Sequence, residues 1–523
     1  MISRSSHYLR EWGRRPLAAA DAALNRLYTW RYNPLYHSGT LVVLAFLLML
    51  VTGVYLLLFY RIGSPYESMV RINEQVWAGS WMRALHRYAA DLAIVAGLLH
   101  SFRIFVQGRS WGPRTLAWVS GVILFFLTFA SGWTGYVMLW DDQAQLLAVE
   151  GARLLDALPI FSEPISRTFV GDRPIPGAFF FLNLFLHIAL PVGVALVLWI
   201  HVSRQSRPAL LPPRGLLWGT TLLLFGASVI GPAPLGPKAD LYRVLGTVEV
   251  DWFYAFFVPM SRLLQPVEAW MAFLAFGALL CLVPWWSRPA PEERPEPSLS
   301  PGRLCTGCTQ CSLDCPYEAI AMVRIVDDDP TREVAEVNED YCVSCGICSA
   351  SCAPMIVGPP DRTGRDELTE IRAFIAEQSI GPKDVVLIAC ARGAGRLAGQ
   401  AEVQGARIFP VICIGNLHTS VVEFLLRAGA GGVLIASCPP RDCWSREGPR
   451  WLEERLYHGR EAELRESVDR RRIRVAYAGE GERRVVLGAL AEFRRDVAEL
   501  DNAVGEDGIE IDTECEPDAR QAL

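Results

Sequence analysis

Four of the eight histidines lie inside long apolar stretches, where an ionisable side chain usually has a functional reason to be present. They form two pairs, His86 with His100 and His187 with His201, and the members of each pair are 14 residues apart. On an α-helix this separation falls about 40° short of four full turns and spans about 21 Å, so each pair occupies one helix face at two depths. Two such helices running in the same direction place His86 opposite His187 and His100 opposite His201. This arrangement indicates bis-imidazole ligation of iron at two stacked haem sites.

Glycines in two other apolar stretches follow the same period. Gly39 and Gly53 are 14 residues apart, as are Gly121 and Gly135. Glycines in membrane helices often serve only as packing points, and a single intramembrane histidine often only hydrogen-bonds a neighbouring helix. A haem lying flat against a helix, however, requires missing side chains at the depth of its ligands. The shared period therefore predicts that these glycines contact the haems.

Eight of the 14 cysteines form two runs of the pattern C-x₂-C-x₂-C-x₃-C, "CTGCTQCSLDCP" and "CVSCGICSASCAP". The spacing is typical of loops that wrap [4Fe–4S] clusters, and a structural zinc site is the alternative. The runs resemble a bacterial two-cluster ferredoxin, in which the fourth cysteine of each run ligates the other cluster. The resemblance implies one cluster on Cys305, Cys308, Cys311 and Cys352, and a second on Cys342, Cys345, Cys348 and Cys315.

Four further cysteines, Cys390, Cys413, Cys438 and Cys443, lie downstream, and the first three each end an apolar run. Because loops at one edge of a parallel sheet converge, the four thiolates are expected to form one site. Buried structural cysteines are the alternative. We expect His418 to be a loop residue, and Cys281 and Cys515 to be incidental.

Six apolar spans must position these side chains: residues 38–58, 85–106, 116–138, 178–201, 215–231 and 266–286. Each is near the roughly 20 residues that cross a bilayer, the fifth being marginal. Six arginines precede the first span, which predicts a cytoplasmic N-terminus: Arg4, Arg10, Arg14, Arg15, Arg26 and Arg31. Six crossings return the chain to the cytoplasm after Trp286, so both termini are expected there.

Composition agrees with a membrane half followed by a soluble half. The 523 residues are 51% hydrophobic and 20% charged, and the net charge of −6 gives no nucleic-acid footprint. No cleavable signal peptide is apparent, and the grouped cysteines indicate metal ligation in a reducing compartment. The expected fold is multidomain: an N-terminal segment (1–37), an all-α transmembrane bundle of six helices (38–286), a Pro-rich linker (287–302), an α+β ferredoxin-like module (303–360), a small α/β domain (383–500) and an acidic, disordered tail (501–523).

Residues 30–286 resemble cytochrome b of the bc and chloroplast-type complexes. The matching stretches are "LHRYAADLAIVAGLLHSFRIF", "GPRTLAWVSGVILFFLTFASGWTGYVMLW" and "LFLHIALPVGVALVLWIHVSR". The resemblance implies that the four histidines ligate haem and that the glycines contact it. It also suggests Arg83, Arg87, Arg103 and Arg114 as partners of the haem propionates, with ordinary interfacial arginines as the alternative.

The stretch "VEVDWFYAFF" is similar to the Pro-Glu-Trp-Tyr segment of the outer quinol site in that family, with Asp251 where Glu is usual. A carboxylate there exchanges protons with a quinone, so Asp251 is the expected catalytic residue. An interfacial aromatic belt is the alternative. The missing Pro, and Leu139-Trp140 in place of the family's Pro-Trp, put the activity of this outer site in doubt. There is no cysteine near Leu35, and hence no basis for the extra covalent haem of the chloroplast-type proteins.

The segments "CPPRDCW" and "VICIGNLHTSVVEFLLRAGAGGVLIASC" resemble the delta subunit of methyl-viologen-reducing hydrogenase. The resemblance implies a [2Fe–2S] cluster, although a further cysteine that the family has near Cys390 is missing. It also implies a cytoplasmic flavoprotein partner of the heterodisulfide-reductase type, within a homo- or hetero-oligomer.

We therefore expect a respiratory electron-transfer subunit in a prokaryotic inner membrane. It passes electrons from a cytoplasmic partner, through iron–sulfur clusters and two b haems, to quinone. Alternatives are quinol oxidation that drives electrons to a low-potential cytoplasmic acceptor, since one charge crossing the membrane is worth ~2.3 kcal/mol per 100 mV, and a membrane anchor or redox sensor without turnover.

Overall fold

The computed structural model describes residues 2–159, 163–170, 175–203, 205–242, 248–249, 251–324, 332–393, 407–460 and 463–506. It divides into two compact units, Met1–Cys345 with Trp444–Arg446, and Gly346–Cys443 with Glu447–Leu523. The boundary between Cys345 and Gly346 falls within the stretch expected to be a ferredoxin-like module. Of the expected acidic tail, residues 507–523 and with them Cys515 lie outside the described residues.

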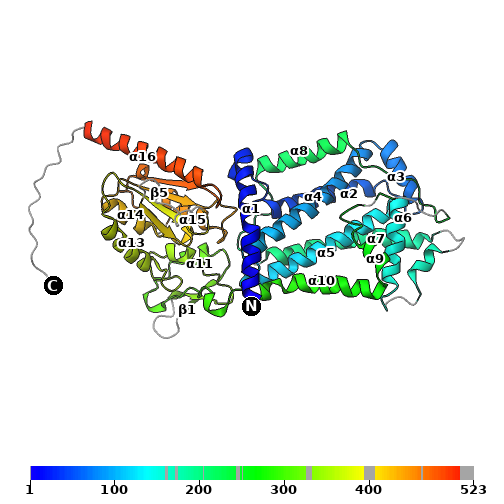
Figure 1. Cartoon of the computed structure of the whole chain (residues 1–523), viewed down its shortest axis with the longest axis horizontal. Helices are drawn as coiled ribbons and strands as arrows, with labels where there is room; N and C mark the ends of the chain where they lie inside the picture. The colour runs from blue at the N-terminus through cyan, green and yellow to red at the C-terminus, as the bar shows by residue number, and fades with distance from the viewer. Residues whose placement is uncertain are drawn as a thin grey trace, which may run out of the picture. The chain divides into compact units, whose positions relative to one another are not determined.

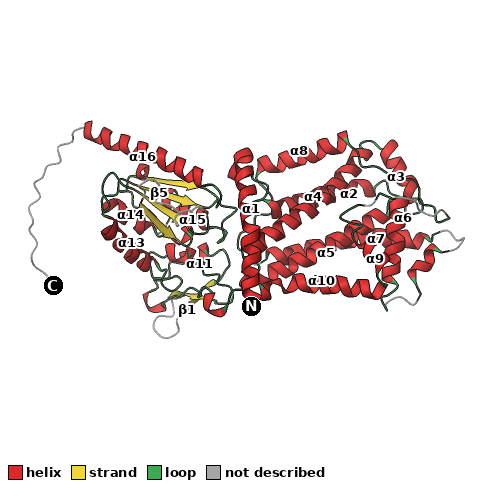
Figure 2. Cartoon of the chain, viewed as in Figure 1, coloured by secondary structure: helices red, strands yellow, loops and turns green. Residues whose placement is uncertain are grey.

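The six predicted spans all form helices in the first unit (Figures 1 and 2). They are α2 (Ser38–Leu57), α4 (Gly79–Val106), α5 (Thr115–Val137), α7 (Gly177–Val202), α8 (Arg214–Ile230) and α10 (Pro266–Trp286). Five are long and apolar enough to cross a membrane, whereas α8 has 17 residues. At 1.5 Å per residue α8 is about 25 Å long, short of the roughly 30 Å hydrocarbon core. The sixth crossing therefore remains a prediction.

Helix α2 packs along α4, and α5 packs along α7, while α8 lies on α4 and α10 on α5. Small side chains make the α2–α4 approach possible, because Ala89, Ala93 and Ala96 are all buried on α4. Large side chains such as Leu50 and Val192 are exposed, as expected where lipid covers a helix.

The remaining helices of this unit are short apart from α1 (Ile2–Tyr32). α3 (Pro65–Glu74), α6 (Asp142–Leu155) and α9 (Phe257–Leu263) lie between the long helices in the sequence. Asp141 is the N-cap residue of α6, and its carboxylate accepts a hydrogen bond from the Ala144 N–H at 2.9 Å. The same carboxylate accepts from Gly236 N–H at 3.1 Å. Because Asp141 follows α5 and Gly236 follows α8, these two helices end on the same face of the bundle.

Residues 303–345 carry little regular structure. Helix α11 (Gln310–Asp314) is followed by a two-stranded antiparallel sheet of β1 (Ile320–Arg324) and β2 (Glu333–Val337), in which Ile320 pairs with Val337. The second unit begins with α12 (Ile347–Ala350).

The rest of the second unit is an α/β domain with a parallel sheet in the order β4-β3-β5-β6. The strands are β3 (Val385–Cys390), β4 (Arg407–Val411), β5 (Gly432–Ser437) and β6 (Ile473–Tyr477). Every residue of β3 and β5 is buried, as in sheets covered on both faces. The order and the parallel pairing agree with the predicted α/β domain.

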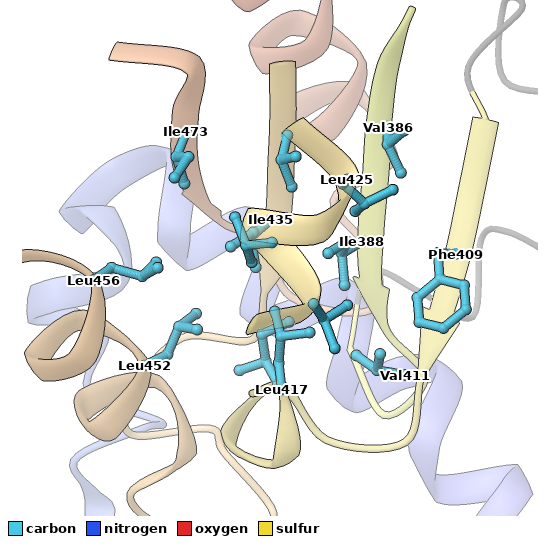
Figure 3. Packing of buried hydrophobic residues seen from close by; sticks show 14 of the residues in the cluster. Val386, Ile388, Phe409, Val411, Leu417, Leu425, Ile435, Leu452, Leu456 and Ile473 are labelled. Carbon is cyan, nitrogen blue, oxygen red and sulfur yellow. The ribbon is translucent and has the colours of Figure 1, made fainter. Parts of the chain in front are cut away.

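Alternation along the strands creates two cores in the second unit. Val386 and Ile388 face α13 (Gly364–Gln378), α14 (Thr419–Arg427) and α15 (Gly448–Tyr457), and this core is drawn in Figure 3. On the other face, Leu387 packs against Phe493 of α16 (Arg483–Glu506). Helix α16 runs past residue 501, where the sequence had indicated the start of the tail.

Candidate redox-cofactor sites

The histidines of α4 and α7 face one another in pairs. The ring centroids of His86 and His187 are 6.2 Å apart, with ring planes at 57°. An atom of iron bonded to one nitrogen of each ring would hold the centroids about 6 Å apart, for metal–nitrogen bonds of about 2 Å. The rings of His100 and His201 are close enough to interact electrostatically. The His86–His187 pair thus has the geometry of a two-imidazole site, and His100 and His201 lie on the same two helices, 14 residues further along each.

Each of the four glycines of period 14 lies against one of these imidazoles. The pairs are Gly39 with His100, Gly53 with His86, Gly121 with His201 and Gly135 with His187. A Cβ atom at Gly135 would approach the His187 Cε1 atom to 2.8 Å, which no real Cβ contact shows. The nearest side-chain neighbour of each glycine is therefore the ligand candidate itself. Missing side chains on α2 and α5 let the rings lie close to the neighbouring helix.

Three hydroxyl groups hold the Nδ1 atoms of these rings. Thr52 donates its hydroxyl hydrogen to Leu48 O at 2.6 Å and lies 2.9 Å from His86 Nδ1, so its oxygen accepts from the Nδ1–H. The equivalent contacts are Ser120 with His201 Nδ1 at 3.1 Å and Thr134 with His187 Nδ1 at 3.2 Å. Protonated Nδ1 leaves Nε2 as the atom that can bind a metal.

Our reading of the sequence missed these hydroxyl residues, although a signal was present. A serine or threonine directly precedes every one of the four glycines: Ser38, Thr52, Ser120 and Thr134. The dipeptide Ser/Thr-Gly therefore recurs with the haem period. At Thr52, Ser120 and Thr134 it places a hydroxyl and a missing side chain next to the same imidazole.

The arginines proposed for propionates all have protein partners in the structure. Arg103 forms two hydrogen bonds with the Asp21 carboxylate, at 2.9 and 3.0 Å. Arg83 donates to Asn73 Oδ1 at 2.8 Å. Within the same unit, the Arg114 guanidinium lies over the rings of Tyr317 and Trp444 and donates to the Tyr317 hydroxyl. Arg87 is described with Asp251 below.

Asp251 belongs to a polar cluster that includes Arg87, the residue that follows His86 on α4. Its Oδ1 atom accepts from the Tyr254 N–H at 2.7 Å, which fixes the turn that carries it. Its Oδ2 atom accepts from Arg87, and Arg87 also pairs with Asp91 one turn further along α4. The Tyr254 ring fits here because residue 132 is glycine, where a Cβ would lie 1.9 Å from the ring. Sequence analysis found Asp251 but not Asp91 or Tyr254.

The two cysteine runs share an unusual backbone conformation. Positive φ angles occur at the same three offsets from the first cysteine of each run: Gly307 and Ser344, Thr309 and Gly346, Glu318 and Met355. Helices α11 and α12 also begin at equal offsets. Backbone turns of this kind point several N–H groups inward, which suits an anionic cluster of thiolates and sulfide. The repeated conformation fits the cysteine loops of a two-cluster module.

The four downstream cysteines are all buried and lie at one edge of the parallel sheet. Cys390 ends β3 and Cys438 follows β5, and a hydrogen bond between their thiols lowers the pKa of Cys390 and raises that of Cys438. A Cβ at Gly448 would lie 3.2 Å from Cys413 Sγ and 3.3 Å from Cys443 Sγ. These contacts link the cysteines in two pairs, and Cys443 also interacts with Cys438.

No group of three or more His, Cys, Asp or Glu side chains, among the described residues, converges tightly enough to hold a single metal ion. A cluster of several irons holds its thiolates further apart than one ion does, so the buried cysteine set remains compatible with an iron–sulfur group. His418 caps α14, where its Nδ1 accepts from Ser420 N–H at 3.1 Å. His418 is therefore a loop residue at the start of α14, as expected from the sequence. Cys281 lies on α10.

Comparison with known proteins decides the family of the membrane unit. A family model described as cytochrome b/b6/petB matches residues 25–205. Cytochrome b6 of Porphyra purpurea is 30% identical over 190 residues, which are 35% of this chain and 87% of that protein. The chain belongs to the cytochrome b/b6 family. Membership of this family implies haem b, and the separation of the His86 and His187 rings is compatible with holding it.

Other relatives and a second family model agree with this division. The menaquinol:cytochrome c reductase cytochrome b subunit of Geobacillus thermodenitrificans is 29% identical over 188 residues, covering 33% of this chain and 84% of that protein. Cytochrome b6 of Heliobacterium mobile is 29% identical, covering 36% of this chain and 93% of its own length. Residues 385–501 match the model for the delta subunit of methyl-viologen-reducing hydrogenase. A solved hyperthermophilic respiratory Complex III covers 48% of this chain and 75% of its own, at 17% identity and a TM-score of 0.39, which is too low to support an argument.

Proposed function

We propose that this cytochrome b-family chain is the membrane-bound electron-transfer subunit of a respiratory oxidoreductase. It carries electrons between a cytoplasmic partner and the quinone pool of a prokaryotic cell membrane. The observation that carries the proposal is the pairing of four histidines across α4 and α7, in a chain that also contains three sets of clustered cysteines. Such donor sets serve one-electron chemistry and not hydrolysis or group transfer.

The residues that would hold the cofactors follow from the geometry and the resemblances. His86 with His187, and His100 with His201, would hold two b haems. The eight cysteines of residues 305–352 would hold two [4Fe–4S] clusters, and Cys390, Cys413, Cys438 and Cys443 one [2Fe–2S] cluster. Arg83, Arg87, Arg103 and Arg114 remain the proposed propionate partners; Arg103 would then share its guanidinium with Asp21. These groups supply reversible one-electron oxidation and reduction.

Quinone is the proposed membrane substrate. The match to the menaquinol:cytochrome c reductase cytochrome b subunit spans 84% of that relative, which supports quinone as the substrate. Asp251 is the proposed proton-exchanging group at the outer site. Its carboxylate pairs with Arg87, and Asp91, which pairs with the same guanidinium, offers a second carboxylate that can receive a proton. Reduction of quinone near His100 and His201 would instead take protons from the cytoplasm.

The soluble residues are proposed to meet a flavoprotein of the heterodisulfide-reductase type. This part of the proposal rests on the delta-subunit match over residues 385–501. With six crossings, the N-terminal segment and the cysteine-bearing residues lie in the cytoplasm, on the side of that partner. Because the chain must receive electrons from a donor protein, we propose that it works within a larger assembly, homo- or hetero-oligomeric.

A second candidate function is quinol oxidation at the outer site, with electrons driven inward to a low-potential acceptor. The polar cluster of Asp251, Arg87, Asp91 and Tyr254 favours it, because two carboxylates that share one arginine are more than an idle outer loop requires. The two functions use the same chain in opposite directions and differ in the order of reduction potentials.

The deciding experiment is an anaerobic potentiometric titration of the purified chain, with haem absorption and iron–sulfur paramagnetic resonance followed together. Two low-spin b haems at potentials well above the clusters would support flow from cytoplasm to quinone. Haems as low as the clusters would favour the second candidate. The variant His86→Leu should lose about half of the haem, and His458→Leu, an exposed histidine on the soluble side, should lose none. A wild-type chain without haem would contradict the proposal.

A further inference from the structure

Arg455 is an unusual residue of the second unit. It lies on α15 and is 0% exposed, the largest fully buried side chain among the described residues. A buried guanidinium requires hydrogen-bond acceptors for its N–H groups, because desolvation of an unsatisfied cation is expensive. The positions of those acceptors therefore show which segments the Arg455 side chain connects.

Three of its acceptors belong to two cysteine-bearing segments. The Nη2 atom donates to Ile347 O at 3.0 Å and to the Ser351 hydroxyl at 2.6 Å. The Nη1 atom donates to Gly415 O at 3.1 Å. Ile347 and Ser351 directly precede Cys348 and Cys352, and Gly415 is two residues after Cys413. One side chain thus joins residues 346–352 of the ferredoxin-like run to the turn that follows β4.

The two segments are in close backbone contact at this point. A Cβ at Gly415 would lie 2.5 Å from the Gly448 Cα atom and 3.0 Å from the Ile347 side chain. A Cβ at Gly346, which has φ of +77°, would collide with the Asn416 amide. Glycines at these positions let α12, the turn at residues 414–416 and the first residue of α15 meet without intervening side chains.

The positive charge of Arg455 acts on the same region. In a buried site such a charge is weakly screened. A nearby cation favours the more negative, reduced form of any redox group that these cysteines hold.

We propose that Arg455 is a positioning residue that fixes residues 346–352 against the turn after Cys413, and that its charge raises the reduction potentials of the groups held by both segments. The inference rests on the proposed iron–sulfur function. It assigns to one cation of the second unit an effect on the relative position of two cysteine sites and on the reduction potentials of the groups that they hold. Neither family resemblance nor spacing assigns a role to this position.

The test is a potentiometric titration of the full-length chain followed by paramagnetic resonance, with three variants. Arg455→Met removes the charge and keeps the length, Arg455→Lys keeps the charge and removes the planar fork, and Arg450→Met is the control. Arg450 lies on the same helix with its side chain 47% exposed. We expect Arg455→Met to lower the potentials of both the C-terminal cluster and the cluster that uses Cys348. Arg450→Met should leave both unchanged.

Arg455→Lys should keep the potentials near those of wild type but change the magnetic coupling between the two clusters, because the fork sets their separation. Coupling and potentials identical to wild type in Arg455→Lys would overturn the positioning role, and this result holds even when Arg455→Met does not fold. Unchanged potentials in a folded Arg455→Met chain would overturn the electrostatic role. A wild-type chain with no iron–sulfur signal would refute the proposed function itself, which distinguishes that failure from the failure of this inference.

Discussion

Thr52, Ser120 and Thr134 commit their hydroxyl hydrogens to backbone carbonyls of their own helices, at 2.6 to 2.7 Å. Their oxygens can then only accept from a histidine Nδ1–H. The choice of imidazole tautomer is therefore made by residues on α2 and α5, and not by the helices that carry the histidines. Orienting partners of this kind also increase the basicity of a metal ligand.

Replacing Thr52 with Val tests this role, because it removes the hydroxyl acceptor of His86 and preserves the shape of the side chain. We expect about tenfold weaker haem retention at the His86–His187 site and a higher haem potential, since the ligand becomes less basic. Haem titration and redox absorbance measure both. The control Thr128→Val removes a hydroxyl that donates to Leu124 O of its own helix. Equal effects in the two variants would contradict a specific role for Thr52.

Gly135→Ala places a methyl group 2.8 Å from the His187 ring and should displace it. We expect loss of about half of the haem, measured by pyridine haemochrome, because only one of the two sites is affected. Gly193 on α7 has no atom within 4 Å of an added Cβ, so Gly193→Ala should retain the full haem content. Full haem in Gly135→Ala would show that the ring has room to move.

Glu367 should make the second unit less stable as pH rises. Burial raises its pKa from 4.5 to about 8, against opposing hydrogen bonds from His418 N–H and the Asn416 amide; Glu370 adds to the rise and Arg455 opposes it. The folded chain holds this proton more tightly than the unfolded chain does. The contribution of protonated Glu367 to the free energy of unfolding is therefore complete below pH 4.5. Between pH 4.5 and pH 8 that free energy falls by about 1.4 kcal/mol per pH unit.

Urea unfolding of the full-length chain at pH 5 and pH 8, followed by protease resistance of the second unit, measures this slope. Glu367→Gln cannot titrate, so its stability should change less between the two pH values than that of wild type. Parallel pH profiles would mean that Glu367 is ionised in the folded state.

At the scale of elements, the open question is whether α8 crosses the membrane. Its length of about 25 Å is short for a bilayer, but local thinning of the lipid accommodates such a mismatch at modest free energy. The contact of Gly236 with Asp141 places the end of α8 on the face where α5 ends. A sixth crossing is compatible with this placement and stays a prediction.

Reporter fusions test the crossing directly. A fluorescent protein that folds only in the cytoplasm should be bright when fused after residue 209 or after residue 290, and dark after residue 237. A periplasmic phosphatase should give the reverse pattern. Brightness after 237 together with darkness after 290 would mean that α8 lies in the membrane without crossing it.

At the scale of the whole molecule, the chain joins a cytochrome b-family unit to a second unit with its own two cores. Relatives such as that of Heliobacterium mobile consist almost entirely of the matched membrane part, since 93% of that protein is covered. We therefore expect the histidine pairs of this chain to form without the cysteine-bearing residues.

A chain ending at residue 302 should keep both haems and lose every iron–sulfur signal. Its haems should still be reduced by dithionite, and their absorption spectrum should match that of the full chain. The control is the full chain with Cys438→Ser, which should lose only the C-terminal cluster. Loss of haem on truncation would show that the membrane unit depends on the soluble residues.

The sequence by itself determined the repeating features: six apolar spans, histidines and glycines of period 14, and cysteine runs whose spacing is local. Such patterns are readable because helix geometry and short loops translate spacing directly into position. Only the tertiary structure decided that each glycine faces an imidazole, that Arg87 joins Asp251 to Asp91, and that Arg455 links residues 346–352 to residue 415. These contacts join residues from 4 to more than 100 positions apart. They depend on how helices and loops pack, and no local period records that packing.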